Sequence, residues 1–143
     1  MANLLLVDDN AEASRPLAML LRYCKYAVDY VSSGAEALAY LNQKLPYLIV
    51  LDVMMPGMDG MEVLRRIRSD SRTNCIPVIM FSAVCDPAYQ AAALKKGADD
   101  YVVKGSEFEL LRQRVERWSS TRHIDLTGGA DCSATDPHPH SYH

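Results

Sequence analysis

The sequence predicts an α/β fold in which a doubly wound, five-stranded parallel sheet carries helices on both faces. Short apolar runs alternate five times with stretches of helical period, as in a parallel sheet with crossover helices. The runs are four or five residues long, the usual length of a buried strand, and helix start signals stand between them. The 143 residues suffice for one globular domain with its own core and are few for two.

The five apolar runs are the predicted strands. In chain order they span residues 4–7, 27–31, 47–51, 78–81 and 100–103. Three of the other segments carry apolar residues at helical spacing. These stripes are Leu17, Leu20, Leu21 and Cys24; Met61, Leu64 and Ile67; and Phe108, Leu111, Val115 and Trp118.

Capping signals place the helix starts. Three pairs have capping-box spacing, and an Asp-Pro pair joins an N-cap to a proline at the first helical position. They are Ser33 with Glu36, Asp59 with Glu62, Ser106 with Glu109, and Asp86 with Pro87. Gly97 fits the end of the helix that Pro87 opens. The first helix has two alternatives: it begins at Asn10 and Pro16 costs an interior hydrogen bond, or it begins later with Ser14 as its cap.

Charge and hydropathy exclude several classes of protein. A net charge of -3 gives no general attraction to nucleic acid or to an anionic membrane, and the sequence has no basic module. No apolar run approaches the roughly 20 residues of a membrane helix, and MANLLLVDDN lacks a basic region and a cleavage site. We therefore expect a cytoplasmic protein that binds neither membrane nor nucleic acid directly.

The four cysteines are widely scattered along the chain. They form no C-x-x-C pair, and no histidine stands at ligand spacing from any of them. The four are Cys24, Cys75, Cys85 and Cys132. We expect the first three to be small buried hydrophobic residues.

The composition changes near residue 118. Residues 119–143 contain few large apolar side chains and many turn formers, which predicts a flexible polar tail after a domain of residues 1–118. All four histidines lie in this tail, three of them within PHPHSYH. A solvated end is the simpler interpretation, and a weak metal site is the alternative.

Open parallel sheets bind ligands at the carboxyl ends of their strands, and polar residues follow the predicted strands there. The second strand, expected at an edge, is followed only by Ser32 and Ser33. Asp8 and Asp9 follow the first strand, Asp52 the third, Ser82 the fourth and Lys104 the fifth. Each residue alone has an ordinary explanation, because an Asp there commonly forms a cap or a turn and a Lys is commonly solvated. Their joint placement at one edge of the sheet predicts a functional site.

Three carboxylates at one edge of the sheet repel one another, so we expect them to bind a proton or a cation. Two carboxylates about 4 Å apart repel by roughly 4 kcal/mol at an effective dielectric constant of about 20. A site made only of oxygen ligands suits Mg²⁺ or Mn²⁺, and the absence of Cys and His disfavours zinc. Beside such an ion Asp52 could attack a phosphoryl group in line, with Lys104 and the metal neutralising its oxygens and Ser82 donating a hydrogen bond. The product would be an aspartyl phosphate.

These segments resemble the receiver domain of two-component response regulators over residues 3 to about 118. The resemblance rests on LLLVDDN at 4–10, LIVLDVMMPGMDG at 48–60, PVIMFSA at 77–83 and KKGADDYVVK at 95–104. It implies a flavodoxin-like fold with strand order 2-1-3-4-5. It also implies a signalling phosphoacceptor that catalyses only its own phosphorylation and dephosphorylation.

The resemblance assigns roles to the residues at the strand ends. Asp52 would accept the phosphoryl group from a histidine kinase or a histidine phosphotransfer protein. Asp9, Asp52 and the backbone carbonyl of Met54 would hold Mg²⁺ directly, Asp8 would orient a metal-bound water, and Lys104 would pair with a phosphoryl oxygen.

The resemblance also implies a switch. The hydroxyl of Ser82, which Ala83 follows, would move onto the phosphoryl group, and the ring of Tyr101 would turn inward. Without the resemblance, Tyr101 is an ordinary half-buried strand aromatic. The readout face would comprise the fourth helix, fifth strand and fifth helix, for which another protein and a second copy of the chain are equal alternatives.

The sequence departs from the family pattern in two places. Family members usually carry a cis proline after the lysine, whereas Lys104 precedes Gly105, which predicts a trans bond and a looser approach of Lys104 to the site. The chain ends in a polar tail, so we expect a stand-alone receiver. In addition, Met54 and Val84 would flank the phosphoryl group, and neither can orient a water, which predicts slow self-dephosphorylation.

Two other functions remain open at this point. A phosphohydrolase of the haloacid dehalogenase type would use Asp52 as nucleophile, but the general acid expected two residues later is replaced by Met54. A receiver-like interaction module would keep the fold without being phosphorylated. Nucleotide or flavin binding is disfavoured because VDDNAE has no glycines for close approach to phosphate.

Overall fold

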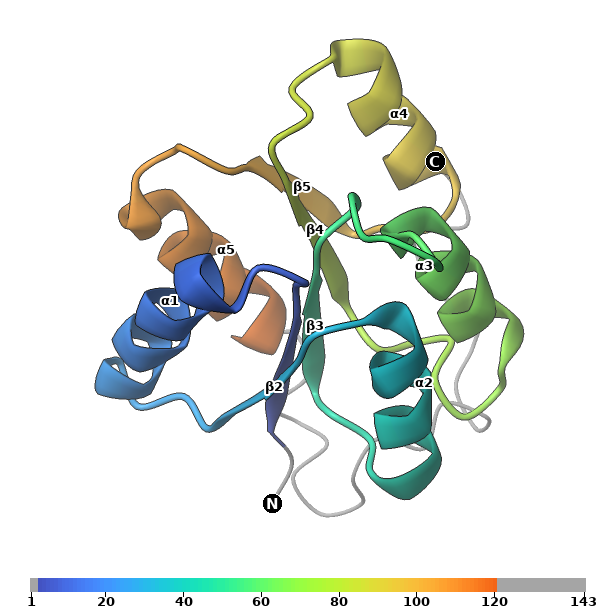
Figure 1. Cartoon of the computed structure of the whole chain (residues 1–143), viewed down its shortest axis with the longest axis horizontal. Coiled ribbons are helices and arrows are strands. Elements are labelled where there is room, and N and C mark those ends of the chain that lie inside the picture. The colour runs from blue at the N-terminus through green and yellow to red at the C-terminus, as the bar shows by residue number, and fades with distance from the viewer. Residues whose placement is uncertain (1–2, 121–143) are drawn as a thin grey trace.

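The computed structural model describes residues 3–120, which form one parallel sheet between two layers of helices (Figure 1). The strands are β1 (Leu4–Val7), β2 (Val28–Val31), β3 (Leu48–Leu51), β4 (Val78–Ser82) and β5 (Asp100–Val103). They lie in the order β2-β1-β3-β4-β5, and every neighbouring pair is parallel. The predicted fold class and strand order are confirmed, with each strand boundary within one residue of its prediction.

The helices divide between the two faces of the sheet. They are α1 (Ala11–Tyr23), α2 (Gly34–Gln43), α3 (Gly60–Ser69), α4 (Pro87–Lys95) and α5 (Phe108–Ser120). Figure 1 shows α1 and α5 on one side of the sheet, with α2, α3 and α4 on the other.

Burial on both faces explains why the central strands are continuously apolar. Successive side chains of a strand point to opposite faces. Leu5 and Val7 of β1 accordingly join the core under α2, α3 and α4, while Leu4 and Leu6 join the core under α1 and α5. All four residues of β1 are fully buried, so none of its positions tolerates a polar side chain without a partner.

Most of the predicted helix ends are confirmed. The side chains of Ser33 and Asp59 accept hydrogen bonds from the third residue of α2 and of α3, each at 3.0 Å. Asp86 caps α4, with Pro87 at its first position. Gly97 lies just past α4 with a φ of +117°, a left-handed conformation that favours glycine.

The structure decides between the two alternatives for α1 and corrects the expected start of α5. Asn10 caps α1 by accepting from the backbone N–H of Ala13 at 3.1 Å, so the helix takes the earlier of its two predicted starts and Ser14 is not its cap. Helix α5 begins at Phe108, two residues after the predicted cap Ser106, whose backbone N–H instead bonds to Val103 in a turn. The turn places Ser106 outside the helix.

Two expectations about apolar side chains were also wrong. Leu20 of the predicted α1 stripe is exposed, because Ser14, Ala18 and Leu21 form the inward face of the helix. Among the cysteines Cys75 is buried, Cys24 is half-buried and Cys85 is exposed on the loop after β4.

Helix α5 continues through Ser120, two residues past the predicted domain boundary at 118. The rest of the predicted tail, including its four histidines, lies outside the described residues. Within residues 3–120, no helix has the length and apolar character needed to cross a membrane.

Arg68 of α3 binds residues at the amino ends of β4 and β5. Its guanidinium donates to the carbonyls of Gly97 at 2.9 Å and Ile76 at 2.8 Å. It also lies 2.9 Å from the carboxylate of Asp99, and the two side chains are only 10% and 6% exposed. The same Asp99 oxygen accepts from the backbone N–H of Val78 at 2.8 Å. This buried ion pair therefore ties α3 to the two strands that carry Ser82 and Lys104.

We predict that Arg68→Ala lowers the free energy of unfolding by about 3–5 kcal/mol, because it removes the positive charge that faces a buried carboxylate. Urea denaturation followed by circular dichroism measures the loss. The matched control is Arg65→Ala on the same helix, which breaks an exposed ion pair with Glu62 and should change stability little. Equal losses in the two variants would contradict the assignment.

Candidate functional site

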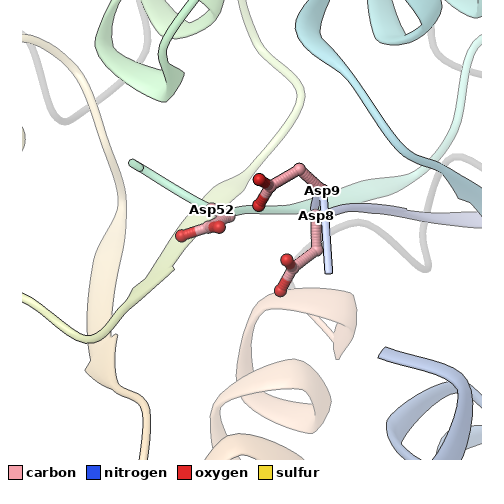
Figure 2. A group of neighbouring side chains, drawn as sticks. All are labelled: Asp8, Asp9 and Asp52. Carbon is pink, nitrogen blue, oxygen red and sulfur yellow. The ribbon is translucent and has the colours of Figure 1, made fainter. Parts of the chain in front are cut away.

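Three carboxylates meet at the carboxyl ends of β1 and β3. Val7 lies opposite Leu51 in the parallel ladder, so the residues that follow them emerge side by side. The backbone N–H of Asp52 donates to the carbonyl of Val7 at 2.9 Å. Figure 2 shows Asp8, Asp9 and Asp52 gathered at this edge, and one oxygen from each lies within 4.8 Å of the others. The structure thus brings together the predicted acidic residues.

The carboxylates differ in exposure. Asp8 is 2% exposed and Asp52 3%, whereas Asp9 is open to solvent. One oxygen of Asp8 accepts from the backbone N–H of Asn10 at 2.9 Å, and the other lies 2.6 Å from Nζ of Lys104. Asp8 is therefore the carboxylate most fully engaged by the protein itself.

Lys104, the residue after β5, reaches the acidic cluster. Its Nζ lies 3.4 Å from Asp52 as well as close to Asp8, and 5.7 Å from the centroid of the Phe81 ring. No peptide bond within residues 3–120 is cis, which confirms the predicted trans bond before Gly105. The predicted looser approach of Lys104 was wrong. Gly105, with a φ of +95°, turns the chain while its neighbour still contacts both carboxylates.

Burial and mutual repulsion set the charge of the cluster. Burial, and then the charge of Asp8, raise the pKa of Asp52 and outweigh the opposing effect of Lys104. Burial alone would lower the pKa of Lys104, but its contacts with Asp8 and Asp52 raise the pKa overall, so the ammonium stays charged. Three carboxylates lie close together and one ammonium contacts only two of them, so the site favours a further cation.

The loop after β3 folds back tightly over Asp52. The backbone N–H of Met54 donates to the Asp52 carboxylate at 3.3 Å, and that of Gly60 donates to the carbonyl of Val53 at 2.8 Å. A Cβ atom on Gly60 would lie 2.2 Å from the carbonyl oxygen of Asp52. Only glycine fits there, a requirement that the sequence analysis missed because the contact joins residues eight positions apart.

Ser82 and Tyr101 meet at the loop after β4. The buried hydroxyl of Ser82 accepts from the backbone N–H of Val84 at 3.1 Å, and Tyr101 donates to the carbonyl of Val84 at 2.7 Å. Tyr101 is 9% exposed and packs in the core under α2, α3 and α4, so its ring already lies inward. Ala83 is exposed on the same loop. The backbone N–H of Lys104 donates to the carbonyl of Ser82 at 2.7 Å, which joins the two strand ends.

The donor set of the cluster fits Mg²⁺. It offers only carboxylate oxygens, one of them from the solvent-exposed Asp9, and it includes neither Cys nor His. The fold and the site together define a flavodoxin-like α/β domain with an acidic cation site at the carboxyl ends of its strands.

Comparisons with known proteins identify the family. Residues 4–116 match the model of the response regulator receiver domain. The chain is 41% identical to the transcriptional regulatory protein AfsQ1 of Streptomyces coelicolor, over 80% of this chain and 50% of that protein. It is 43% identical to ResD of Bacillus subtilis, over 71% of this chain and 41% of that protein. The chain belongs to the family of response regulator receiver domains, a signalling family whose members are phosphorylated by histidine kinases.

Solved structures agree with this assignment. A receiver domain of a signal transduction histidine kinase from Syntrophus aciditrophicus is 31% identical, with a TM-score of 0.79 over 86% of this chain and 93% of that one. The response regulator TrrA of Thermotoga maritima, in complex with Mg²⁺ and BeF, is 30% identical, with a TM-score of 0.74 over 82% and 99% of the two chains. The chain spans half or less of the length of AfsQ1 and ResD.

We predict that Gly60→Ala destabilises the protein by about 2 kcal/mol or more, because the new methyl group would overlap the Asp52 carbonyl. Gly57→Ala is the matched control: its φ of +80° makes alanine cost about 1 kcal/mol, but no atom lies within 4 Å of the added Cβ. Urea denaturation ranks the two variants. If Gly60→Ala proved as stable as wild type or Gly57→Ala, the close approach would be refuted.

Proposed function

We propose that this chain is a phosphoacceptor of a two-component phosphorelay, in which Asp52 receives a phosphoryl group from a phosphohistidine of a histidine kinase or a histidine phosphotransfer protein. The observation that carries the proposal is the placement of Asp52. Its carboxylate is almost fully buried, lies beside two other carboxylates and is 3.4 Å from the ammonium of Lys104. The TrrA complex with Mg²⁺ and BeF supports the same role for a related domain.

The reaction is an in-line transfer. An oxygen of Asp52 forms a bond to phosphorus while the bond from phosphorus to the imidazole nitrogen breaks, and the electron pair stays on the imidazole. Burial and the charge of Asp8 raise the pKa of Asp52, and the positive charge of Lys104 opposes that rise. Lys104, charged at neutral pH, binds a phosphoryl oxygen and neutralises part of its charge.

A divalent cation completes the site. Asp9, Asp52 and the backbone carbonyl of Met54 would hold Mg²⁺, with Asp8 holding a metal-bound water. Mn²⁺ suits the same oxygen ligands. When bound, the ion supplies positive charge to the phosphoryl oxygens. The engagement of Asp8 by Lys104 and Asn10 supports its outer position in this arrangement.

Phosphorylation would act on the loop after β4. The Ser82 hydroxyl, which accepts from Val84, would donate to a phosphoryl oxygen and draw Ala83 and Val84 with it. The hydroxyl of Tyr101 donates a hydrogen bond to the carbonyl of Val84. Because Tyr101 belongs to β5, a shift of the loop would alter the surface formed by α4, β5 and α5. The phosphoryl group can shift the equilibrium toward the active arrangement only if it interacts more strongly with that arrangement than with the inactive one.

The downstream partner of this surface is a protein or a second copy of the chain. The receiver domain over residues 1–118 and the cytoplasmic location stay predictions. The alternative phosphohydrolase lacks support at its general acid position, where the side chain of Met54 is 59% exposed and carries no titratable group.

We predict that incubation with Mg²⁺ and acetyl phosphate adds one phosphoryl group to the wild type and none to Asp52→Asn. Intact-mass spectrometry measures the adduct. The control is Asp86→Asn, which keeps the cap of α4 and tests an exposed aspartate outside the acidic cluster. A wild type that stays unmodified would favour a receiver-like interaction module, and steady phosphate release from a phosphoester would favour the hydrolase.

We predict that Met54→Asn shortens the lifetime of the phosphorylated protein about fivefold. The methionine thioether cannot orient a water, whereas an asparagine amide can, and one such hydrogen bond is worth about 1 kcal/mol. Decay of the adduct, followed by mass spectrometry after removal of the phosphodonor, gives the two lifetimes. Faster decay in the wild type than in the variant would refute the slow self-dephosphorylation.

A further inference from the structure

Tyr30 reaches from the edge strand to the backbone of the acidic site. It lies on β2 opposite Leu6 of β1, and its ring packs against the core under α1 and α5. Its hydroxyl donates a hydrogen bond to the backbone carbonyl of Asp8 at 2.5 Å. The sequence pattern alone indicates no special role for Tyr30, because half-buried aromatic residues are common in strands.

The carbonyl that Tyr30 holds belongs to the peptide between Asp8 and Asp9. This peptide stands where the chain leaves β1 and turns toward the cap of α1 at Asn10. The rest of Asp8 is fixed from other directions: its backbone N–H donates to Val31 at 3.2 Å, and its carboxylate accepts from Asn10 and contacts Lys104. Tyr30 is thus the side chain that fixes the peptide linking the two carboxylates.

Of the three carboxylates, that of Asp9 depends most on this peptide for its position. Asp9 is exposed, and its carboxylate is the part of the cluster open to solvent. An exposed side chain on a mobile peptide loses conformational freedom when it binds an ion, and that loss weakens binding. A peptide already held by a hydrogen bond from the partly buried Tyr30 loses less of this freedom. Residues outside the coordination shell of other metal sites orient the metal ligands in the same way.

We propose that Tyr30 is a positioning residue for the cation site, in which its hydroxyl fixes the Asp8–Asp9 peptide and so raises the affinity for a divalent cation without touching the ion or the phosphoryl group. The inference rests on the proposed function of the acidic cluster. It assigns a role in cation binding to a side chain of the edge strand. A phenylalanine ring would pack equally well at this position, so the proposed role in cation binding belongs to the tyrosine hydroxyl.

The test compares the wild type, Tyr30→Phe and the matched control Tyr26→Phe. Tyr26 packs against the same core but lies before β2, at the end of the sheet away from the acidic cluster. Isothermal titration calorimetry measures Mg²⁺ affinity in the absence of any phosphodonor. We expect Tyr30→Phe to bind Mg²⁺ about three- to tenfold more weakly and Tyr26→Phe to match the wild type.

A second measurement separates positioning from general damage to the structure. The rate of phosphorylation by acetyl phosphate is followed against Mg²⁺ concentration, with thermal unfolding recorded for each variant. Tyr30→Phe should need about three- to tenfold more Mg²⁺ for half of its maximal rate, yet reach the wild-type rate at saturation. A loss of maximal rate with unchanged Mg²⁺ dependence would overturn the role in cation binding.

The outcomes distinguish this inference from the proposed function. If the wild type binds Mg²⁺ and is phosphorylated while Tyr30→Phe has the same Mg²⁺ affinity, the positioning role fails and the proposed function stands. An equal loss of affinity in Tyr26→Phe has the same meaning. A wild type that neither binds Mg²⁺ nor accepts a phosphoryl group defeats both proposals together.

Discussion

The structure depends on one electrostatic constraint: two almost fully buried carboxylates lie at adjacent strand ends and share one ammonium group. The parallel pairing of β1 with β3 places Asp8 beside Asp52, and the pairing of β4 with β5 directs Lys104 toward both. Such a concentration of like charge is costly in a protein interior. The site therefore favours a cation, and a phosphoryl group can then bind where positive charge has been gathered.

The rest of the domain holds this edge of the sheet rigid. Fully buried strands leave the backbone at the strand ends little freedom, and Arg68 fixes β4 and β5 at their other ends. Close to the site, Gly60 admits the returning loop and Tyr30 holds the peptide between Asp8 and Asp9. The loop at Val84 is hydrogen-bonded both to Ser82 and to Tyr101, and we propose that phosphorylation of Asp52 acts on this loop.

Much of this arrangement could be predicted from the sequence, because the strong signals are local. Strands buried on both faces are continuous apolar runs, and caps such as Asp59 lie at fixed spacing from their helices. The rest depends on contacts through space. The register of α1 exposes Leu20, the turn after β5 displaces the start of α5 from Ser106, and the fit of Gly60 depends on where Asp52 lies. Lys104 also contacts the carboxylates more closely than its Gly105 neighbour suggested.

The central claim is that the acidic side chains converge to bind a divalent cation next to Asp52. The most direct measurement is anomalous diffraction from crystals of the protein grown with Mn²⁺ in place of Mg²⁺. We expect a peak within coordinating distance of carboxylate oxygens of Asp9 and Asp52 and of the Met54 carbonyl, with Asp8 one water further out. A peak elsewhere, or no peak with the three carboxylates spread apart, would contradict the account.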